Sequence, residues 1–230
     1  MGVTSFPGNP EIPLKLRKNA RARRMTLRIS RVDGGVTLTV PRGVSEREAL
    51  AFAAEKRDWV VGHLSKQARP ERVDPGQRLT VGDQVFEIVQ GTQRRLSVKD
   101  GCITLPAPVE TGRVHLQAWL KEQARAALTR ASDHYADRLG RRYTRLTLRD
   151  TRSRWGSCSS AGALMYSWRL ILAPTDVLNY VAAHEVAHLK EMNHSAAFWR
   201  VVDQLYGPHH DARAWLRHEG PKLHRFRFDA

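Results

Sequence analysis

Three histidines and one glutamate in the C-terminal third of the chain constrain its fold more than any other feature. His184 and His188 are four residues apart, so they lie on one face of a helix, one turn from each other. Glu185 follows the first histidine and can reach a water on a shared metal ion without binding the ion itself. His194 comes six residues after the second histidine, just before Ser195, which we expect to cap the next helix. The chain must therefore fold so that a helix and the turn that follows it meet around one ion.

The residues around this motif predict the helix that it needs. We expect a helix that begins at Thr175 as its N-cap and runs to about Glu191, with Asp176 in its first turn. One stripe of this helix is apolar and should be buried: Val177, Leu178, Val181 and Leu189. Three neutral imidazoles leave one position open on a Zn²⁺ ion, where a bound water becomes acidic. The motif therefore predicts a zinc hydrolase in which Glu185 takes the proton of that water and passes it to the leaving group.

The N-terminal half of the chain is rich in the period-two alternation that is typical of β-strands. Ser45, with Glu48 three residues later, forms a capping box that predicts a helix reaching about Gln67. The alternation predicts three hairpins: residues 25–40 with a turn at Asp33-Gly34-Gly35, residues 79–89, and residues 94–105.

The C-terminal half is predominantly helical. An apolar stripe predicts a helix over residues 112–139, and two short strands are expected around 146–148 and over 163–172. The chain is therefore expected to be α+β. We expect three parts: a flexible tail over 1–13, a β-rich domain with one helix over 14–107, and a helical domain over 108–230 that carries the metal helix.

The charge of the chain is unusual, because its formal net charge is +15 and its pI is about 10.7. Such a field attracts polyanions, including nucleic acids and nucleotides. Eight basic residues and no acidic residue lie between Lys15 and Arg31. This segment is either a binding surface for nucleic acid or the solvated face of a strand, and charge alone does not decide between them.

Other features narrow the class of protein. No apolar run is long enough for a membrane helix, and the N-terminus lacks the apolar stretch of a secretory signal, so we expect a cytoplasmic protein. Cys102 and Cys158 form no CxxC pair and are expected to be reduced thiols rather than metal ligands.

Several further residues are candidates for the surroundings of the metal. The strand expected over 163–172 precedes the metal helix and could pair with an extended peptide substrate, or it could be an ordinary core strand. In the segment Arg154-Trp155-Gly156-Ser157-Cys158, the glycine indicates a close backbone approach or a tight turn near the site. Arg154 could bind a carboxylate or phosphate, or anchor a buried acid. Tyr166, His209 or His210 could stabilise an oxyanion, although such histidines usually lie on the surface without a role.

The chain resembles the YgjP-like metallopeptidase family, which is grouped with the WLM and SprT-type zincins. The resemblance extends over nearly the whole chain, and its most specific segments are Arg154–Cys158, Trp168–Pro174 and the HEVAHLKEMNHS motif with Phe198-Trp199. It implies a zincin-like C-terminal half in which His184, His188 and His194 hold the zinc and Glu185 is the catalytic glutamate. The spacing is also similar to that of the metzincins, but Glu191 stands where they have a glycine.

We therefore expect a zinc-dependent metallopeptidase acting on a peptide or protein substrate. One alternative is a zinc-dependent nucleoside triphosphate (UTP) pyrophosphatase, because some relatives carry that label and the chain is basic. It fits less well with a single zinc and no carboxylate cluster for Mg²⁺. The other alternative is a basic nucleic-acid-associated protein whose zinc is structural.

Overall fold

The computed structural model describes residues 3–30, 34–65 and 70–229. By their internal contacts the residues divide into two compact units, Met1–Arg69 and Pro70–Ala230. Both units combine sheets with helices, and the helices concentrate in the C-terminal half, so the α+β expectation is confirmed. The turn residue Asp33 and the predicted helix end at Gln67 lie outside the described residues.

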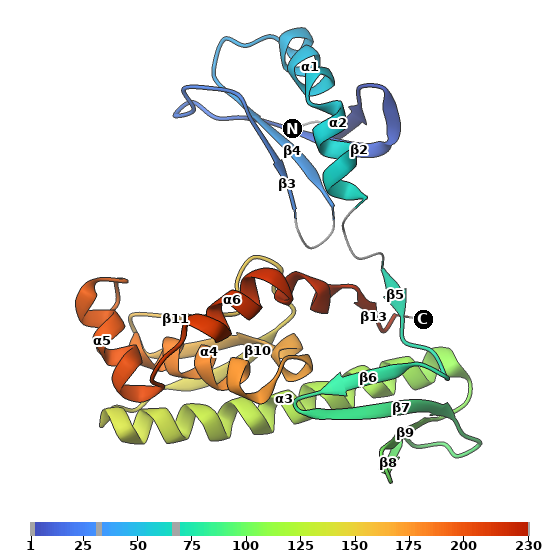
Figure 1. Cartoon of the computed structure of the whole chain (residues 1–230), viewed down its shortest axis with the longest axis vertical. Coiled ribbons are helices and arrows are strands. Elements are labelled where there is room, and N and C mark those ends of the chain that lie inside the picture. Colours follow the sequence, from blue (N-terminus) through green and yellow to red (C-terminus); the bar gives the residue numbers. More distant parts are fainter. Residues whose placement is uncertain (1–2, 31–33, 66–69, 230) are drawn as a thin grey trace. The chain divides into compact units, whose positions relative to one another are not determined.

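The N-terminal unit is a four-stranded sheet, in the order β1-β2-β4-β3, with two helices packed on one face (Figure 1). Its elements are β1 (Val3–Phe6), β2 (Asn9–Lys18), β3 (Thr26–Ile29), β4 (Val36–Val40), α1 (Glu46–Glu55) and α2 (Arg57–Leu64). β3 and β4 pair antiparallel, as the alternation over 25–40 predicts. Ser45 and Glu48 form the predicted capping box at the start of α1.

Two expectations for this unit need correction. Residues 3–18 form β1 and β2 instead of a loose tail, because Gly8 makes the turn between them and Leu14 of β2 is fully buried. The single helix predicted from Ser45 is two helices, since the chain leaves helical geometry at Lys56. The polar middle of that segment supplies no continuous apolar stripe that would favour one straight helix.

The C-terminal unit contains the remaining elements (Figure 1). Its strands are β5 (Glu71–Arg72), β6 (Arg78–Val81), β7 (Gln84–Gln90), β8 (Ser97–Lys99), β9 (Cys102–Leu105), β10 (Arg145–Arg149), β11 (Gly156–Cys158), β12 (Ala163–Ser167) and β13 (Phe226–Arg227). Its helices are α3 (Val109–Leu139), α4 (Thr175–Ala187), α5 (Ala196–Leu205) and α6 (His210–His218), with 3-10 turns η1 (Trp168–Leu172) and η2 (Gly220–His224). None of the helices in the described ranges is long and apolar enough to cross a membrane.

The boundary between the units lies near residue 70, whereas we expected it near residue 107. The two hairpins predicted over 79–105 form one sheet, β6-β7-β9-β8. The buried residues Ile88 and Leu105 of this sheet belong to the same core as Leu116 and Leu120 of α3. The hairpins therefore pack with the helices that follow them, and α3 begins at Val109, directly after the boundary that we expected.

The strand predicted over 163–172 is only half right. β12 ends at Ser167, and residues 168–172 form η1, whose side chains are all buried. A fully buried apolar run carries no periodicity that separates a strand from a helical turn. β12 is also the central strand of the sheet β10-β12-β11, so β11 is an edge strand and β12 is not.

The start of α4 is fixed by a residue from a distant hairpin. Thr175 is the first residue of the helix and not its N-cap, and its backbone N–H donates to Oδ1 of Asp83 at 2.9 Å. The neighbouring Gly82, in the left-handed region at φ 60°, donates its N–H to the carbonyl of Ile171. The turn between β6 and β7 therefore positions the N-terminal end of the helix that carries the metal motif.

Replacing Asp83 with alanine should remove this cap and lower the free energy of unfolding by about 1 kcal/mol. For a unit of this size, that corresponds to a Tm lower by roughly 2–4 °C, which differential scanning calorimetry would detect. The hydrogen bonds from Thr175 lower the pKa of Asp83, so the difference should persist at neutral pH and shrink as the pH falls through that lowered pKa. Asp83→Asn keeps an acceptor oxygen and should lose less, and equal losses in both variants would contradict the capping role.

Candidate metal centre

The three motif histidines converge on one point. His184 lies in the last turn of α4, His188 directly follows that helix in helical conformation, and His194 directly precedes the cap of α5. Their ligand atoms all lie within 4.8 Å of one another, and Nε2 of His184 is 3.0 Å from Nε2 of His194. Two nitrogens on one tetrahedral zinc ion are about 3.3 Å apart. Across the described ranges, no other cluster of His, Cys, Asp or Glu side chains has this convergence.

The protonation of these histidines suits a metal. Nδ1 of His188 lies 2.9 Å from the backbone carbonyl of Glu191, to which it donates, so its Nε2 keeps a lone pair for a ligand. Burial, followed by the nearby His188 and His194, lowers the pKa of His184 to about 3, and charges on Arg213 and His209 add to this. Burial also lowers the pKa of His188. Metal ions bind neutral imidazoles, so this donor set fits a zinc ion.

The side chain of Glu185 on α4 lies against Gly156 of β11. Its side chain is only 6% exposed, and burial raises its pKa to about 8, an effect that the charge of Arg154 opposes. A Cβ atom placed on Gly156 would lie 2.5 Å from Cγ and Oε1 of Glu185. The close backbone approach predicted for this glycine is therefore confirmed, and what it approaches is the glutamate of the motif.

Aromatic rings line the other side of the histidine cluster. Phe198 of α5 stacks on His188, with ring centroids 4.5 Å apart. Trp199 lies 5.8 Å from the rings of both His184 and His194. Phe198 and Trp199 therefore cover one side of the histidine cluster. His194 is exposed, so the cluster opens to solvent at this residue.

The other candidates from the sequence have different surroundings. Tyr166 is fully buried in the core, and its hydroxyl is 3.1 Å from that of Ser132 on α3. The His210 ring is fully solvent-exposed beside Asp211. His209, in contrast, is packed between two aromatic rings close to the histidine cluster.

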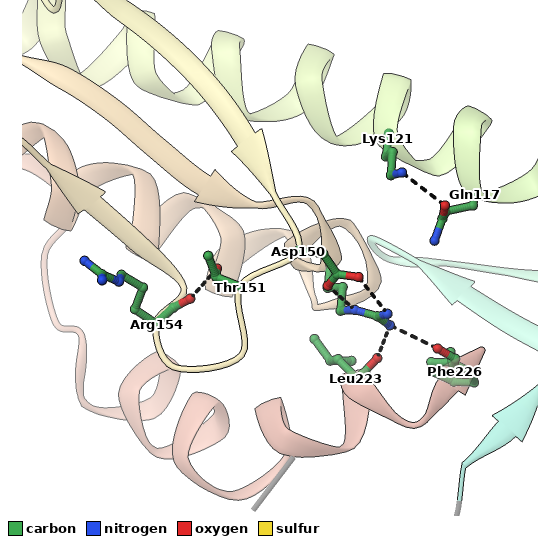
Figure 2. Close-up of polar contacts among 8 residues, drawn as sticks. Gln117, Lys121, Asp150, Thr151, Arg154, Leu223 and Phe226 are labelled. Carbon is green, nitrogen blue, oxygen red and sulfur yellow. Dashed lines mark hydrogen bonds and ion pairs between the residues drawn. The ribbon is translucent and has the colours of Figure 1, made fainter. Parts of the chain in front are cut away.

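Arg154 precedes the glycine that contacts Glu185. Its side chain is exposed, and its backbone carbonyl accepts a hydrogen bond of 2.8 Å from the Thr151 hydroxyl (Figure 2). Of the two roles that the sequence left open for Arg154, the contact with a buried acid is the one favoured, because the charge of Arg154 lowers the pKa of Glu185. No hydrogen bond joins the two side chains in the described structure.

An ion pair between a buried arginine and a partly exposed aspartate was missed from the sequence. Arg169 of η1 is 5% exposed and donates to both carboxylate oxygens of Asp150, at 2.7 and 3.1 Å. It also donates to the carbonyls of Leu223 and Phe226 in the C-terminal segment (Figure 2). The pair fixes the start of the loop that leads from β10 to β11. We predicted residues 168–172 as a strand, so nothing in the sequence indicated that this arginine would be buried.

The family profile described as "YgjP-like, metallopeptidase domain" matches residues 23–219, which is most of the chain. The chain belongs to the YgjP-like metallopeptidase family. It is also similar to the metallopeptidase zymogen abylysin of Pyrococcus abyssi, known from a crystal structure. That alignment has 23% identity and a TM-score of 0.37, and covers 43% of this chain and 97% of the other. No curated protein matches the sequence. Family membership supports a hydrolase that uses a metal ion.

Gly156→Ala should displace the Glu185 side chain, because the added methyl group would occupy the position of its Cγ and Oε1. We expect hydrolytic activity to fall about 100-fold, since the glutamate that the sequence predicts as the base would lose its position, while metal binding stays within twofold of the wild type. Gly62→Ala is the matched control, because a Cβ there meets no atom within 4 Å. Full activity in Gly156→Ala, measured beside its metal content, would contradict this account of the glycine.

Proposed function

We propose that the chain is a zinc-dependent metallopeptidase in which His184, His188 and His194 hold the ion. The observation that carries the proposal is the convergence of three imidazoles, with pKa values lowered at His184 and His188, beside a buried glutamate. When bound, zinc supplies Lewis acidity that makes a coordinated water a nucleophile near neutral pH and polarises a substrate carbonyl. Membership of the YgjP-like metallopeptidase family supports the same chemistry.

Glu185 is the general base of the proposed reaction. Its carboxylate takes a proton from the attacking water while the water oxygen bonds to the carbonyl carbon of the substrate. As the C–N bond breaks, Glu185 delivers that proton to the leaving amine nitrogen, and the carboxylate is regenerated. The backbone of Gly156 and the packing of α4 against β11 hold the carboxyl group in place.

A peptide substrate can align along β11. This strand is the edge of its sheet, and its first residue contacts Glu185. An extended peptide that adds to the edge through backbone hydrogen bonds would pass the histidine cluster. We therefore transfer to β11 the substrate-aligning role that the sequence suggested for residues 163–172, since β12 is paired on both sides.

The UTP pyrophosphatase alternative has weaker support. Phosphoryl transfer from a nucleotide usually needs carboxylates that hold Mg²⁺, and the cluster found within the described ranges consists of histidines alone. Cys102 and Cys158 are free thiols, as expected for the reducing cytoplasm in which we propose that the protein acts.

The test compares the zinc-loaded protein with Glu185→Gln on a proteome-derived peptide library and a nucleotide panel, both followed by mass spectrometry. We expect peptide cleavage by the wild type and a loss of at least about 100-fold in the variant, because a carboxamide cannot accept the proton. The zinc content of the variant should be unchanged. Removal of zinc with a chelator should abolish cleavage, and addition of zinc should restore it.

The control is Glu122→Gln, which changes an exposed glutamate of α3 and should retain full activity. Release of pyrophosphate from UTP without peptide cleavage would overturn the peptidase proposal in favour of the nucleotide hydrolase.

A further inference from the structure

His209 lies between two aromatic rings that also contact the histidine cluster. It stacks on Tyr180 with ring centroids 5.7 Å apart and planes 6° apart, and on Trp199 at 5.2 Å and 13°. Tyr180 is 5.9 Å from the ring of His184, and Trp199 is 5.8 Å from the rings of His184 and His194. The sandwich therefore places His209 one ring beyond the histidine cluster, on the side formed by α5 and α6.

The two nitrogens of His209 have different surroundings. Nδ1 is buried and lies 3.0 Å from Oδ1 of Asp203 on α5. This contact has the distance of an ion pair but not the geometry of a hydrogen bond. Nε2 has no hydrogen-bond partner in the described part of the chain and is not among its buried polar atoms. Nδ1 thus faces the carboxylate of Asp203, and Nε2 is free to bind a ligand.

An imidazole with a proton on Nε2 can donate a hydrogen bond from this position. The carboxylate of Asp203 lies beside the ring, and the faces of Tyr180 and Trp199 enclose it. Arg213 of α6 lies over the ring of Trp199, 4.6 Å from its centroid, so this side of the site is positively charged. Negative charge develops on the carbonyl oxygen of a peptide during hydrolysis, and a positioned donor stabilises it.

We propose that His209 is a catalytic residue that donates a hydrogen bond from Nε2 to the substrate carbonyl oxygen, and that Asp203 positions it. This inference rests on the proposed peptidase function. In this arrangement the oxyanion is stabilised from the α5–α6 side of the histidine cluster. Glu185, on the β11 side, takes the proton of the water and delivers it to the leaving amine. The neighbouring His210 has neither the stack nor the buried partner, so it has no such role.

The test uses His209→Phe, which can keep the stack but removes the donor, with His209→Gln as a second variant in case phenylalanine disturbs folding. On the best-cleaved library peptide we expect kcat to fall about 100- to 1,000-fold with KM within about threefold, as for the loss of one oxyanion donor. Asp203→Asn should lower kcat about 10-fold. A phosphinic peptide analogue should lose affinity in proportion to kcat/KM.

Two readouts do not depend on activity. Zinc affinity should stay within twofold of the wild type in every variant. In the zinc-free protein, the ¹⁵N NMR signal of Nδ1 of His209 should shift in Asp203→Asn, because the neighbouring carboxylate is removed. His210→Phe is the matched control and should leave kcat, KM and zinc affinity unchanged.

The outcomes separate the two proposals. An active wild type with an equally active His209→Phe would overturn the role of His209 alone. A parallel loss of zinc affinity and activity in both His209 variants would also overturn it, because the residue would then support the metal site. A wild type that cleaves no peptide would overturn the proposed function together with this inference.

A second, independent inference concerns the sheet of the N-terminal unit. Its buried face packs against α1 and α2, and its other face carries basic side chains in register. Lys15 of β2 and Arg28 of β3 pair with opposite sides of Thr37 on β4, and Arg17 pairs with Thr39 in the next row. All three cations are exposed, so this face of the sheet is basic.

The loop between β2 and β3 carries three further exposed arginines, Arg21, Arg23 and Arg24. The six cations have no ion-pair partner within the described residues, and no acidic residue lies between Lys15 and Arg31 in the sequence. A group of exposed charges of one sign without ion-pair partners is complementary to a polyanion.

We propose that this basic face binds the phosphate backbone of a nucleic acid duplex. Cations two residues apart on a strand are roughly 6.7 Å apart, a spacing that lets neighbouring side chains reach successive phosphates. Aromatic side chains for stacking of single-stranded bases are absent from the rows described here, which carry lysine, arginine and threonine. The sequence left a nucleic-acid surface and a solvated strand face open, and the register of the cations favours the first.

Fluorescence anisotropy with labelled duplex DNA and duplex RNA, over a salt series, tests this proposal on the full chain. The triple variant Lys15→Gln, Arg17→Gln, Arg28→Gln should bind at least 10-fold more weakly. The slope of log K against log salt should fall by about 2.7, or about 0.9 for each lost phosphate contact. The control variant Arg78→Gln, Arg125→Gln, Arg141→Gln removes the same charge from exposed sites of the other unit and should change affinity less than threefold.

Equal losses in both triple variants would overturn the proposal, because binding would then reflect net charge alone. Binding to neither duplex at low salt would also overturn it. Peptidase activity should be the same in both variants, which keeps this inference separate from the proposed reaction.

Discussion

The site depends on the burial of α4 on nearly every side. Nine of its thirteen residues are buried, and three of these are the small residues Ala182, Ala183 and Ala187. Small side chains let neighbouring elements approach closely, and α4 contacts α3, α5, α6, β11 and η1. A helix held from so many directions has one position and one rotation, so the motif side chains have fixed directions. The few polar groups that it carries inward are those of the candidate site.

This packing explains why one segment produces two opposite electrostatic effects. Burial lowers the pKa of His184 and raises that of Glu185, because in each case the charged form loses its hydration. Without an ion, burial of these polar groups lowers the free energy of unfolding and no interaction compensates for it. A divalent cation would accept the lone pairs of the neutral imidazoles and favour an ionised glutamate, so it would remove both costs together. The same residues that destabilise the metal-free fold therefore favour metal binding.

Much of the fold could be predicted because its signals are local. The hairpin over 25–40 and the long helix that ends at Gly140 follow from alternation and from a helical stripe. The errors arise where local signals are weak or are decided by distant contacts. Trp168–Leu172 is apolar at nearly every position and became a 3-10 turn around a buried arginine. The unit boundary depends on hairpins that pack against α3, which no local pattern reports.

The same distinction between local signals and distant contacts applies to the candidate site. The three histidines and the glutamate lie on one helix and in the turn that follows it, so spacing alone was enough to predict that they come together. The glycine in Arg154–Cys158 indicated a close approach without naming its partner. His209 and His210 are neighbours that sequence reasoning could not distinguish. Packing distinguishes them, because Tyr180 and Trp199 enclose one ring and leave the other in solvent. Tyr180, Trp199 and Asp203 fix the orientation of the His209 ring when the protein folds, while its Nε2 stays free. No further loss of side-chain entropy is then needed when substrate binds, which is the condition for an effective donor in catalysis.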